Sequence, residues 1–284
     1  VTAKGSTPAS NSPTDIANAI ANIGERFYNA ELVHRNNKSL SNGSKNPMIS
    51  DTYTLKENGY YLAFLATYGS MNNNAYSCTD TASLTYNSST SYTSDGYLIN
   101  YAPDYNRASI HNYSKYAIFN GTKDKIISYS KNLNSGTYAS CIAMSFGLFK
   151  VEDVITLFYK NKKTGYGTGS VTLSDSYNIA TVGKYLVIVS SDGASSNSGY
   201  TDILSGIKTT IKFNDEITVE FPVTEKINID NLNSNGSVGT GSISSDVKFC
   251  FIEGSGTLYV ERYYSTWSSY NATASLEYFI FKIG

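Results

Sequence analysis

The chain has 284 residues, a formal net charge of −1 at pH 7 and only 16% charged residues. This balance lacks the basic surface that attracts nucleic acids or anionic membranes, so we expect neither as a partner. Partners are expected to be neutral, or to be recognised by shape and hydrogen bonds. The 25 Tyr and 22 Gly residues, with many Ser, Asn and Thr, suit exposed β-structure and recognition of sugars or proteins, although an AT-rich genome also enriches Asn and Tyr.

The sequence gives little sign of membrane insertion or of a disulfide framework. No apolar run reaches the roughly 18 residues of a membrane-spanning helix, and no signal-peptide pattern opens the chain. Because the chain begins at Val1 rather than Met, we expect a processed or partial product. Cys78, Cys141 and Cys250 have no short spacing. This pattern predicts buried thiols at the latter two rather than a zinc site.

Residues 1–24 are expected to form a linker and then a short helix. Ser12 can cap the helix, Pro13 fits its first position and Gly24 ends it. Such a short helix is marginal alone, so its apolar face should pack either on the neighbouring module or against other helices on an assembly axis. That face is formed by Ile16, Ala19, Ile20 and Ile23.

From Glu25 onward the helical period disappears. Short runs of Tyr, Ile, Val, Phe and Thr are separated by clusters of Asn, Gly and Ser, which is typical of a sandwich or barrel. Hairpin turns are predicted at Asn120-Gly121, at Asn214-Asp215 and within Asn161–Gly165.

One stretch occurs twice in the chain. Ser50–Ser70 and Ser174–Ala194 align without a gap, and the similar segments 142–151 and 274–283 close the two halves. The repeat predicts two homologous modules, at residues 25–151 and 152–284. The identities in the first stretch are Ser50/Ser174, Asp51/Asp175, Tyr53/Tyr177, Gly59/Gly183, Tyr61/Tyr185, Leu62/Leu186 and Gly69/Gly193.

Two kinds of strand are expected in each module. Tyr60–Tyr68 and Lys184–Ser191 are apolar on both faces, which predicts central strands covered on each side. The closing segments alternate instead, which predicts one buried and one exposed face. The residues on the expected buried face are Ile142, Met144, Phe146 and Leu148, and in the second module Ala274, Leu276, Tyr278 and Ile280.

No catalytic motif is recognisable. His34 and His111 stand outside any nucleophile or zinc motif, and His34 aligns with Phe158 in the second module, which favours an ordinary strand residue. The recurring Asp51 and Asp175 precede predicted strands, where Asp commonly forms a turn. A pair of glycosidase carboxylates has no sequence motif, so a motif search does not test for one.

The segment Asn231–Gly236 has the spacing of a calcium loop. It offers amides where calcium prefers carboxylates, so a flexible polar loop is the better interpretation. We therefore expect no metal, no cofactor and no enzymatic activity.

Two aromatic clusters are candidate binding surfaces. Aromatic faces stack on sugar rings and anchor protein interfaces, although these rings could instead cover the ends of a sandwich. The first cluster is Tyr92, Tyr97, Tyr101 and Tyr105; the second is Tyr263, Tyr264, Trp267 and Tyr270.

The N-terminal segment resembles one that recurs in tail-fibre and tail-associated proteins of phages infecting Gram-positive bacteria. Both have a Lys-Gly, here Lys4-Gly5, a Pro-containing spacer and the pattern Asp-Ile-Ala-x-x-Ile-x-x-Ile, here from Asp15 to Ile23. The tandem Gly-x-Tyr-Leu modules look like the distal domains of such fibres, and also like trimeric jelly rolls. The resemblance implies an extracellular, homotrimeric virion protein of the tail that contacts host wall polysaccharide and other virion proteins. It carries over no receptor-contact residue.

We therefore expect an all-β protein with a short N-terminal helix and two tandem, homologous, jelly-roll-like β-sandwich modules. Its expected role is multivalent adhesion to the host surface. One alternative is a non-adhesive virion part, such as a tail-tip, baseplate or capsid-decoration protein. Another is a bacterial surface adhesin or carbohydrate-binding module. A polysaccharide depolymerase fits least, because such enzymes usually place paired carboxylates in a long groove and charge is sparse here.

Overall fold

The computed structural model describes residues 30–40, 46–71, 79–87, 90–91, 97–101, 109–134, 140–197, 206–218, 221–222, 227–230, 240–265 and 271–284. The elements within these residues are all β-strands, paired antiparallel in three sheets, so the predicted all-β class is confirmed. The helix expected from Ile16, Ala19, Ile20 and Ile23 lies outside the described residues.

The first half of the chain forms sheets A and B, which face each other. Consecutive strands mostly alternate between the two sheets, which is the arrangement of a jelly roll. Sheet A has the order β1 (Ala30–Leu40), β9 (Ser140–Val151), β3 (Gly59–Met71), β7 (Ser109–Gly121) and β6 (Tyr97–Tyr101). Sheet B has the order β2 (Met48–Thr54), β8 (Ile126–Asn134), β4 (Thr79–Tyr86) and β5 (Thr90–Ser91).

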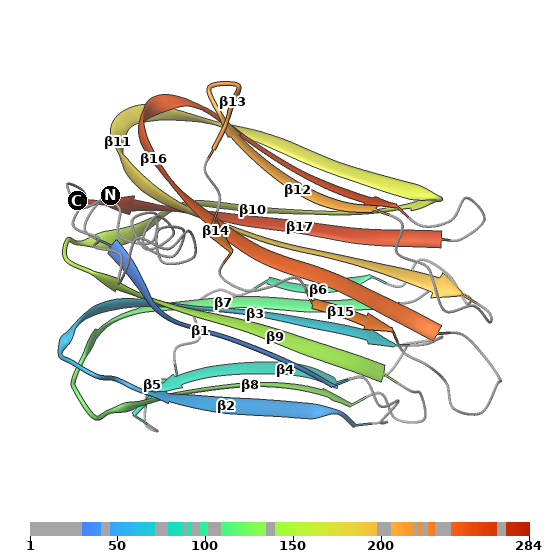
Figure 1. The fold of residues 1–284 in the computed structure, drawn as a ribbon, viewed down its shortest axis with the longest axis horizontal. Coiled ribbons are helices and arrows are strands. Elements are labelled where there is room, and N and C mark those ends of the chain that lie inside the picture. Colours follow the sequence, from blue (N-terminus) through green and yellow to red (C-terminus); the bar gives the residue numbers. More distant parts are fainter. Residues whose placement is uncertain are drawn as a thin grey trace, which may run out of the picture.

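The second half forms one sheet, C, that curls over on itself (Figure 1). Its order is β10 (Ile155–Thr168), β17 (Asn271–Ile283), β11 (Ser170–Asn197), β16 (Thr240–Ser265), β12 (Gly206–Phe213) and β13 (Glu216–Ile217). Short strands β14 (Phe221–Pro222) and β15 (Ile227–Asp230) also pair with β16.

The long strands β11 and β16 each contribute to both sides of a second sandwich. The first part of β11 pairs with the last part of β16, and its second part also pairs with β17. The β11–β16 register shifts between Ile179 and Gly183, opposite Gly254 and Gly256, which have φ values of +109° and +154°. These glycines allow the sharp bend that turns one sheet into two layers.

The two halves share one strand order. In sheet C, β10, β17, β11, β16 and β15 are arranged as β1, β9, β3, β7 and β6 are in sheet A. The boundary predicted at residues 151 and 152 falls between β9 and β10. The division of the chain into two modules at residues 25–151 and 152–284 stays a prediction.

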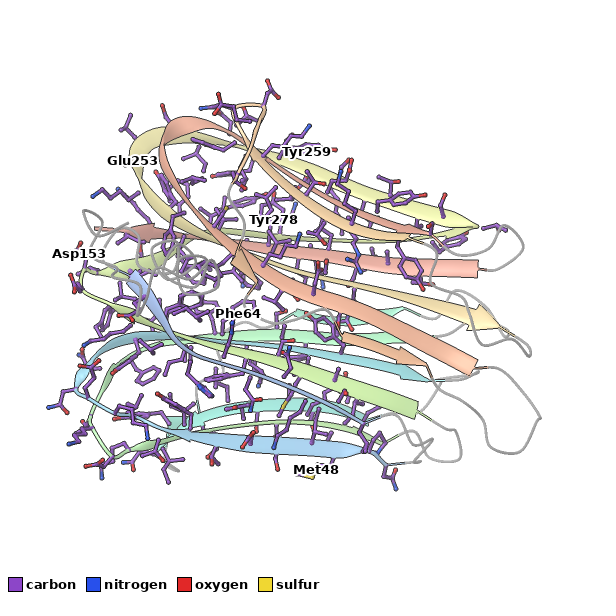
Figure 2. All side chains as sticks on the ribbon, viewed as in Figure 1. Met48, Phe64, Asp153, Glu253, Tyr259 and Tyr278 are labelled. Atoms are coloured by element: carbon purple, nitrogen blue, oxygen red, sulfur yellow. The ribbon has the colours of Figure 1, made fainter. Side chains whose placement is uncertain are left out.

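Sheet A lies between sheet B and sheet C, so it is covered on both faces (Figure 1). We call the apolar cluster between sheets A and C the shared core. Figure 2 places Phe64 between these layers, where its ring meets Phe279 edge-on with 5.1 Å between centroids, as Phe149 meets Phe249. The shared core also contains Leu32, Leu62, Tyr68, Val151, Ile155, Leu186, Ile188, Val247, Phe281 and Ile283.

The shared core corrects the expectation for the closing strands. The predicted inward faces are confirmed, since Ile142 and Phe146 pack inside the first sandwich and Leu276 and Ile280 inside the second. The opposite faces are not exposed, because residues 142–149 and 273–281 are buried throughout. Stacking of sheet A on sheet C covers the side that was expected to meet water.

One predicted turn is confirmed and two are corrected. Asn214 and Asp215 have positive φ values of 51° and 65°, as a tight hairpin needs. Asn120-Gly121 lies at the end of β7, and the turn follows at residues 122–125. Asn161–Gly165 continues β10, where Asn161 is held by a side-chain bond to Asp175 on β11.

Candidate functional site

The predicted aromatic clusters lie on different sheets. Tyr97 and Tyr101 are the end residues of β6 in sheet A, whereas Tyr263 and Tyr264 belong to β16 in sheet C. Tyr263 is 38% exposed, but Tyr264 is fully buried, with its ring against Gly193. Tyr264 is therefore a core residue and does not suit a surface-binding role. The remaining candidates, Tyr92, Tyr105, Trp267 and Tyr270, lie outside the described residues.

The recurring aspartates tie neighbouring strands together. Asp51 accepts a hydrogen bond from Asn36 Nδ2 at 2.6 Å and pairs with Lys38 Nζ at 2.8 Å. The hydrogen bond from Lys38 is the main cause of a lowered pKa at Asp51. Asp51 stands within β2 rather than before a strand, which corrects the turn expected there. Its bonds connect β2 of sheet B to β1 of sheet A.

The second half repeats this tie. Asp175 on β11 accepts hydrogen bonds from Asn161 Nδ2 and from the Tyr278 hydroxyl, both at 2.7 Å, and pairs with Lys163 Nζ at 2.9 Å. Burial pushes the pKa of Asp175 upward, but these three partners outweigh it and hold the pKa below its usual value. Both aspartates are thus ionised structural groups, which explains why they recur.

His34 and Cys250, for which the sequence predicted no catalytic or metal-binding role, both lie within strands. His34 lies in β1 and stacks on Tyr53 with 4.0 Å between ring centroids, which agrees with an ordinary strand residue. Burial lowers the pKa of His34, although the charge of Asp51 opposes it. Cys250 is a buried thiol, as predicted. Cys78 lies outside the described residues, as does the Asn231–Gly236 segment.

Each sandwich encloses a buried cation that the sequence reasoning missed. Lys131 on β8 is fully buried and lies 2.5 Å from Asp80, and Arg262 on β16 is fully buried and lies 3.2 Å from Asp246. The two cations occupy corresponding places. Lys131 follows Ser130, which pairs with Ser50, and Arg262 follows Glu261, which pairs with Ser174. Strand alternation could have found Lys131, because it shares the inward face with Tyr129 and Leu133.

Two carboxyl groups are buried where sheets A and C meet. Asp192 on β11 accepts a hydrogen bond from Asn112 Nδ2 at 2.9 Å, and Asn112 also donates to Ser275 at 2.7 Å. Burial raises the pKa of Asp192 to about 6, against the effects of Asn112 and Arg262. Burial likewise raises the pKa of Glu277 to about 7. We therefore expect the contact between the two halves to be sensitive to pH.

The described residues offer neither a metal cluster nor a membrane helix. In the ranges given above, no three His, Cys, Asp or Glu side chains gather closely enough to hold a metal ion. Over the same part of the chain, no helix is long and apolar enough to cross a membrane.

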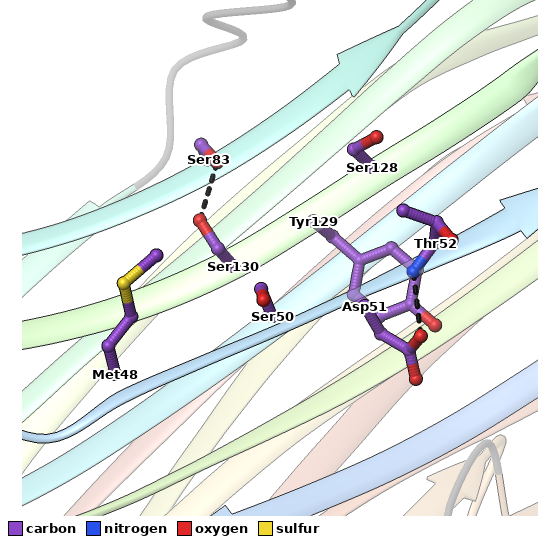
Figure 3. Close-up of a pocket in the computed structure, with 8 residues that line it drawn as sticks. All are labelled: Met48, Ser50, Asp51, Thr52, Ser83, Ser128, Tyr129 and Ser130. Atoms are coloured by element: carbon purple, nitrogen blue, oxygen red, sulfur yellow. Dashed lines mark hydrogen bonds between the residues drawn. The ribbon is translucent and has the colours of Figure 1, made fainter.

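The outer face of sheet B carries a shallow hollow of about 430 Å³ (Figure 3). Around it lies a set of small hydroxyl side chains that we call the hydroxyl face. Ser83 and Ser130 of this face are hydrogen-bonded at 2.7 Å, and Met48, 60% exposed, lies at one end of the hollow. The hydroxyl face consists of Ser50 and Thr52 on β2, Ser83 and Thr85 on β4, and Ser128 and Ser130 on β8.

Among the described residues that line this hollow, Asp51 is the only charged one, and its carboxylate is paired with Lys38 at the edge of the sheet. The Tyr129 hydroxyl beside it accepts a hydrogen bond from Asn36, and burial raises the pKa of Tyr129 to about 12. The described lining of the hollow therefore offers mainly neutral hydroxyl donors and acceptors.

The solved structures that this chain resembles include two from studies of archaeal viruses. One, from the atomic structure of Sulfolobus turreted icosahedral virus, is 14% identical with a TM-score of 0.28, over 87% of this chain and 60% of that one. The other, from a study of the triple jelly roll fold and turret assembly in an archaeal virus, is 13% identical with a TM-score of 0.27, over 89% of this chain and 61% of that one. This chain therefore spans less than two thirds of the length of either.

No protein-family model matches the sequence, and the search of characterised proteins finds no match.

Proposed function

We propose that this chain is a structural protein of a virion and that it attaches the particle to a glycan of the host cell surface. It acts by binding rather than by catalysis, as part of a tail fibre or receptor-binding assembly outside the cell. Attachment is multivalent: several weak contacts on one particle combine through their high effective concentration.

The observation that carries the proposal is the stacking of two jelly rolls through the shared core. Jelly rolls serve both viral capsid proteins and lectins, although the fold alone does not decide between them. A stack with a continuous apolar core suits a load-bearing body, because its layers cannot slide without exposing Phe64 and Phe149. The resemblance of residues 1–24 to a tail-fibre segment favours a phage particle, and the weakly charged surface favours a neutral ligand.

The test is binding of the fluorescently labelled full chain to intact cells from a panel of Gram-positive strains. We expect saturable binding to at least one strain, with loss of binding when soluble wall polysaccharide from that strain is added. Binding that no polysaccharide displaces would contradict the glycan ligand, and no binding to any strain would contradict attachment and leave a non-adhesive virion part.

A non-adhesive part is the second candidate, because a continuous shared core also suits a purely structural role. It predicts that the chain associates with other virion proteins and ignores cells. Co-purification of the chain with particles, combined with silence in the cell-binding assay, would establish that candidate.

A further inference from the structure

The hydroxyl face is a regular array. Antiparallel pairing sets Ser50 opposite Ser130, and Ser130 opposite Ser83, in one row across three strands. The next row is Thr52, Ser128 and Thr85. Adjacent strands are about 4.8 Å apart, and residues on one face recur about every 6.8 Å along a strand. Two complete rows of hydroxyl groups therefore stand at near-constant spacing on the outer surface.

The topologically equivalent face of the second jelly roll differs in chemistry. There the row begun by Ser174 continues with Glu261, and the row begun by Ser176 continues with Tyr259 and Lys212. Lys212 lies 5.8 Å from the Tyr259 ring centroid, and the Tyr259 hydroxyl donates to Glu261 at 2.6 Å. That face carries charged groups, with Tyr259 bonded to Glu261, whereas the face of the first jelly roll carries uncharged hydroxyl groups, of which Ser83 and Ser130 bind each other.

The size of the hydroxyl face limits its occupant. The hydroxyl face has two rows, and one further row flanks it at each end, at Met48 and at Thr54. These four rows on three strands cover roughly 10 by 20 Å, or about 200 Å². A stable protein interface buries about 800 Å² on each partner. A second copy of this chain would bury too little surface area on this face for a stable contact. A narrow linear chain needs no larger area. The hollow, at about 430 Å³, falls within the range of small-ligand sites.

We propose that the hydroxyl face binds a neutral, polyhydroxylated chain, namely an uncharged wall polysaccharide, with its sugar rings seated over Ser83, Ser128 and Ser130. Each serine hydroxyl both donates and accepts a hydrogen bond, so it complements sugar hydroxyls in either direction. A phosphate-bearing polymer would find no cation among the described residues that line the hollow, and the nearby Lys38 is paired with Asp51. The inference rests on the proposed attachment function and gives it a site and a ligand class.

The decisive variant is Ser130→Glu, which copies the residue that the second jelly roll carries at the same place in its sheet. That copy shows that the position accepts a carboxylate in a folded sheet. Ser176→Glu, on the equivalent outer face of the second jelly roll, adds the same charge away from the site. Ser130→Thr keeps the hydroxyl group. If Ser130→Glu does not fold, Ser83→Glu on the exposed neighbouring strand replaces it.

Full-length wild type and variants are titrated onto cells of a strain that wild type binds, with purified neutral wall polysaccharide and with teichoic acid as competitors. We expect Ser130→Glu to lose at least tenfold in affinity, Ser176→Glu and Ser130→Thr to stay within twofold, and only the neutral polysaccharide to compete.

Each other outcome would reject the site, the ligand class or attachment itself. Equal binding by wild type and Ser130→Glu would reject the site while attachment stands. Competition by teichoic acid alone would reject the neutral ligand. Loss of binding in Trp267→Ala but not in Ser130→Glu would assign the contact to the aromatic cluster. No binding by wild type would reject attachment itself.

Discussion

Tyr61 and Tyr185 explain why a Gly-x-Tyr-Leu signature occurs twice. The Tyr61 hydroxyl donates to the Glu57 carbonyl at 2.9 Å, and the Tyr185 hydroxyl donates to the Thr181 carbonyl at 2.7 Å. The glycine two residues earlier lies against each ring, where a larger side chain would crowd it. Each tyrosine thus fastens the corner through which the chain passes from one sheet to the other.

Replacement of either tyrosine by phenylalanine tests these corners. Tyr61→Phe and Tyr185→Phe should each lower the free energy of unfolding by about 1 kcal/mol, the net value of one hydrogen bond. Urea unfolding measures the change, with Tyr263→Phe on the outer surface as a control that should change little. Equal, negligible effects for all three variants would show that the corner bonds add no stability.

Glu277 predicts a pH dependence with a definite sign. Burial raises its folded pKa from 4.5 to about 7, so its favourable contribution is complete below the unfolded pKa and is lost as pH rises through 7. The loss is on the order of 3 kcal/mol. The Glu277 side chain faces Ser114 on β7, Lys160 and Lys162 on β10, and Tyr68 on β3.

The variant Glu277→Gln removes this titration. We expect it to be more stable than wild type at pH 8 and to approach wild type at pH 4.5, as measured by thermal unfolding at both values. The exposed Glu152→Gln is the control and should shift stability by the same small amount at both pH values. A constant difference between Glu277→Gln and wild type from pH 4.5 to 8 would contradict a raised pKa.

At the scale of the strand, the bend of β16 depends on two glycines with different surroundings. A side chain at Gly256 would collide with Asn214. The Asn214 side chain accepts a hydrogen bond from Thr257 N and donates one to the Ser255 carbonyl in the adjoining turn. Gly254 also has a positive φ but has open space around it. The bend is therefore fixed at Gly256 by contact and at Gly254 by backbone conformation alone.

Alanine substitutions separate these two effects. Gly254→Ala should cost about 1 kcal/mol for the unfavourable φ, and Gly256→Ala should cost clearly more because Asn214 must also move. Denaturant unfolding of both variants gives the comparison. A smaller loss of stability in Gly256→Ala than in Gly254→Ala would contradict this explanation of the bend.

The sequence pattern was informative where a property is local to one strand. Alternation placed Ile142 and Phe146 correctly in the core, and the repeat aligned β3 with the second part of β11. The same alternation read further would have placed Arg262 and Tyr264 inside, since Leu258 and Val260 share their face. Sequence reasoning missed them because it treated aromatic and charged residues near a loop as surface.

Properties that depend on a second sheet could not be read from one strand. Nothing in the alternation of β9 shows that sheet C covers its other side, so Ala143 and Phe149 were expected to be exposed. The hydroxyl face was missed for a related reason. Alternate Ser and Thr on β2 and β8 look like any solvated face, and only strand register shows that three strands align their hydroxyl groups.

At the scale of the whole molecule, we predict that the N-terminal segment serves assembly rather than folding. Deletion of residues 1–24 should lower the oligomer from the trimer that the sequence resemblance implies toward a monomer, because the apolar face of the expected helix would be lost. Both halves should keep their β-sheet signal by circular dichroism. Light scattering gives the mass, and an unchanged mass would refute an assembly role for Ile16, Ala19, Ile20 and Ile23.

The two halves are joined by polar as well as apolar contacts. The Tyr68 hydroxyl lies 2.9 Å from the Ser190 hydroxyl, and Asn112 bonds to Asp192 and Ser275 across the same junction. Phe64 stands at its apolar centre. Neither jelly roll can therefore unfold without exposing a large apolar face of the other, so the pair should behave as one cooperative body.

Differential scanning calorimetry of the full chain, wild type and Phe64→Ala, tests this claim most directly. We predict one transition whose calorimetric and van't Hoff enthalpies agree, and a single shift to lower temperature in Phe64→Ala, which removes about 3–5 kcal/mol of stability. Two separate transitions, only one of which responds to Phe64→Ala, would show that the jelly rolls fold independently and would contradict the shared core.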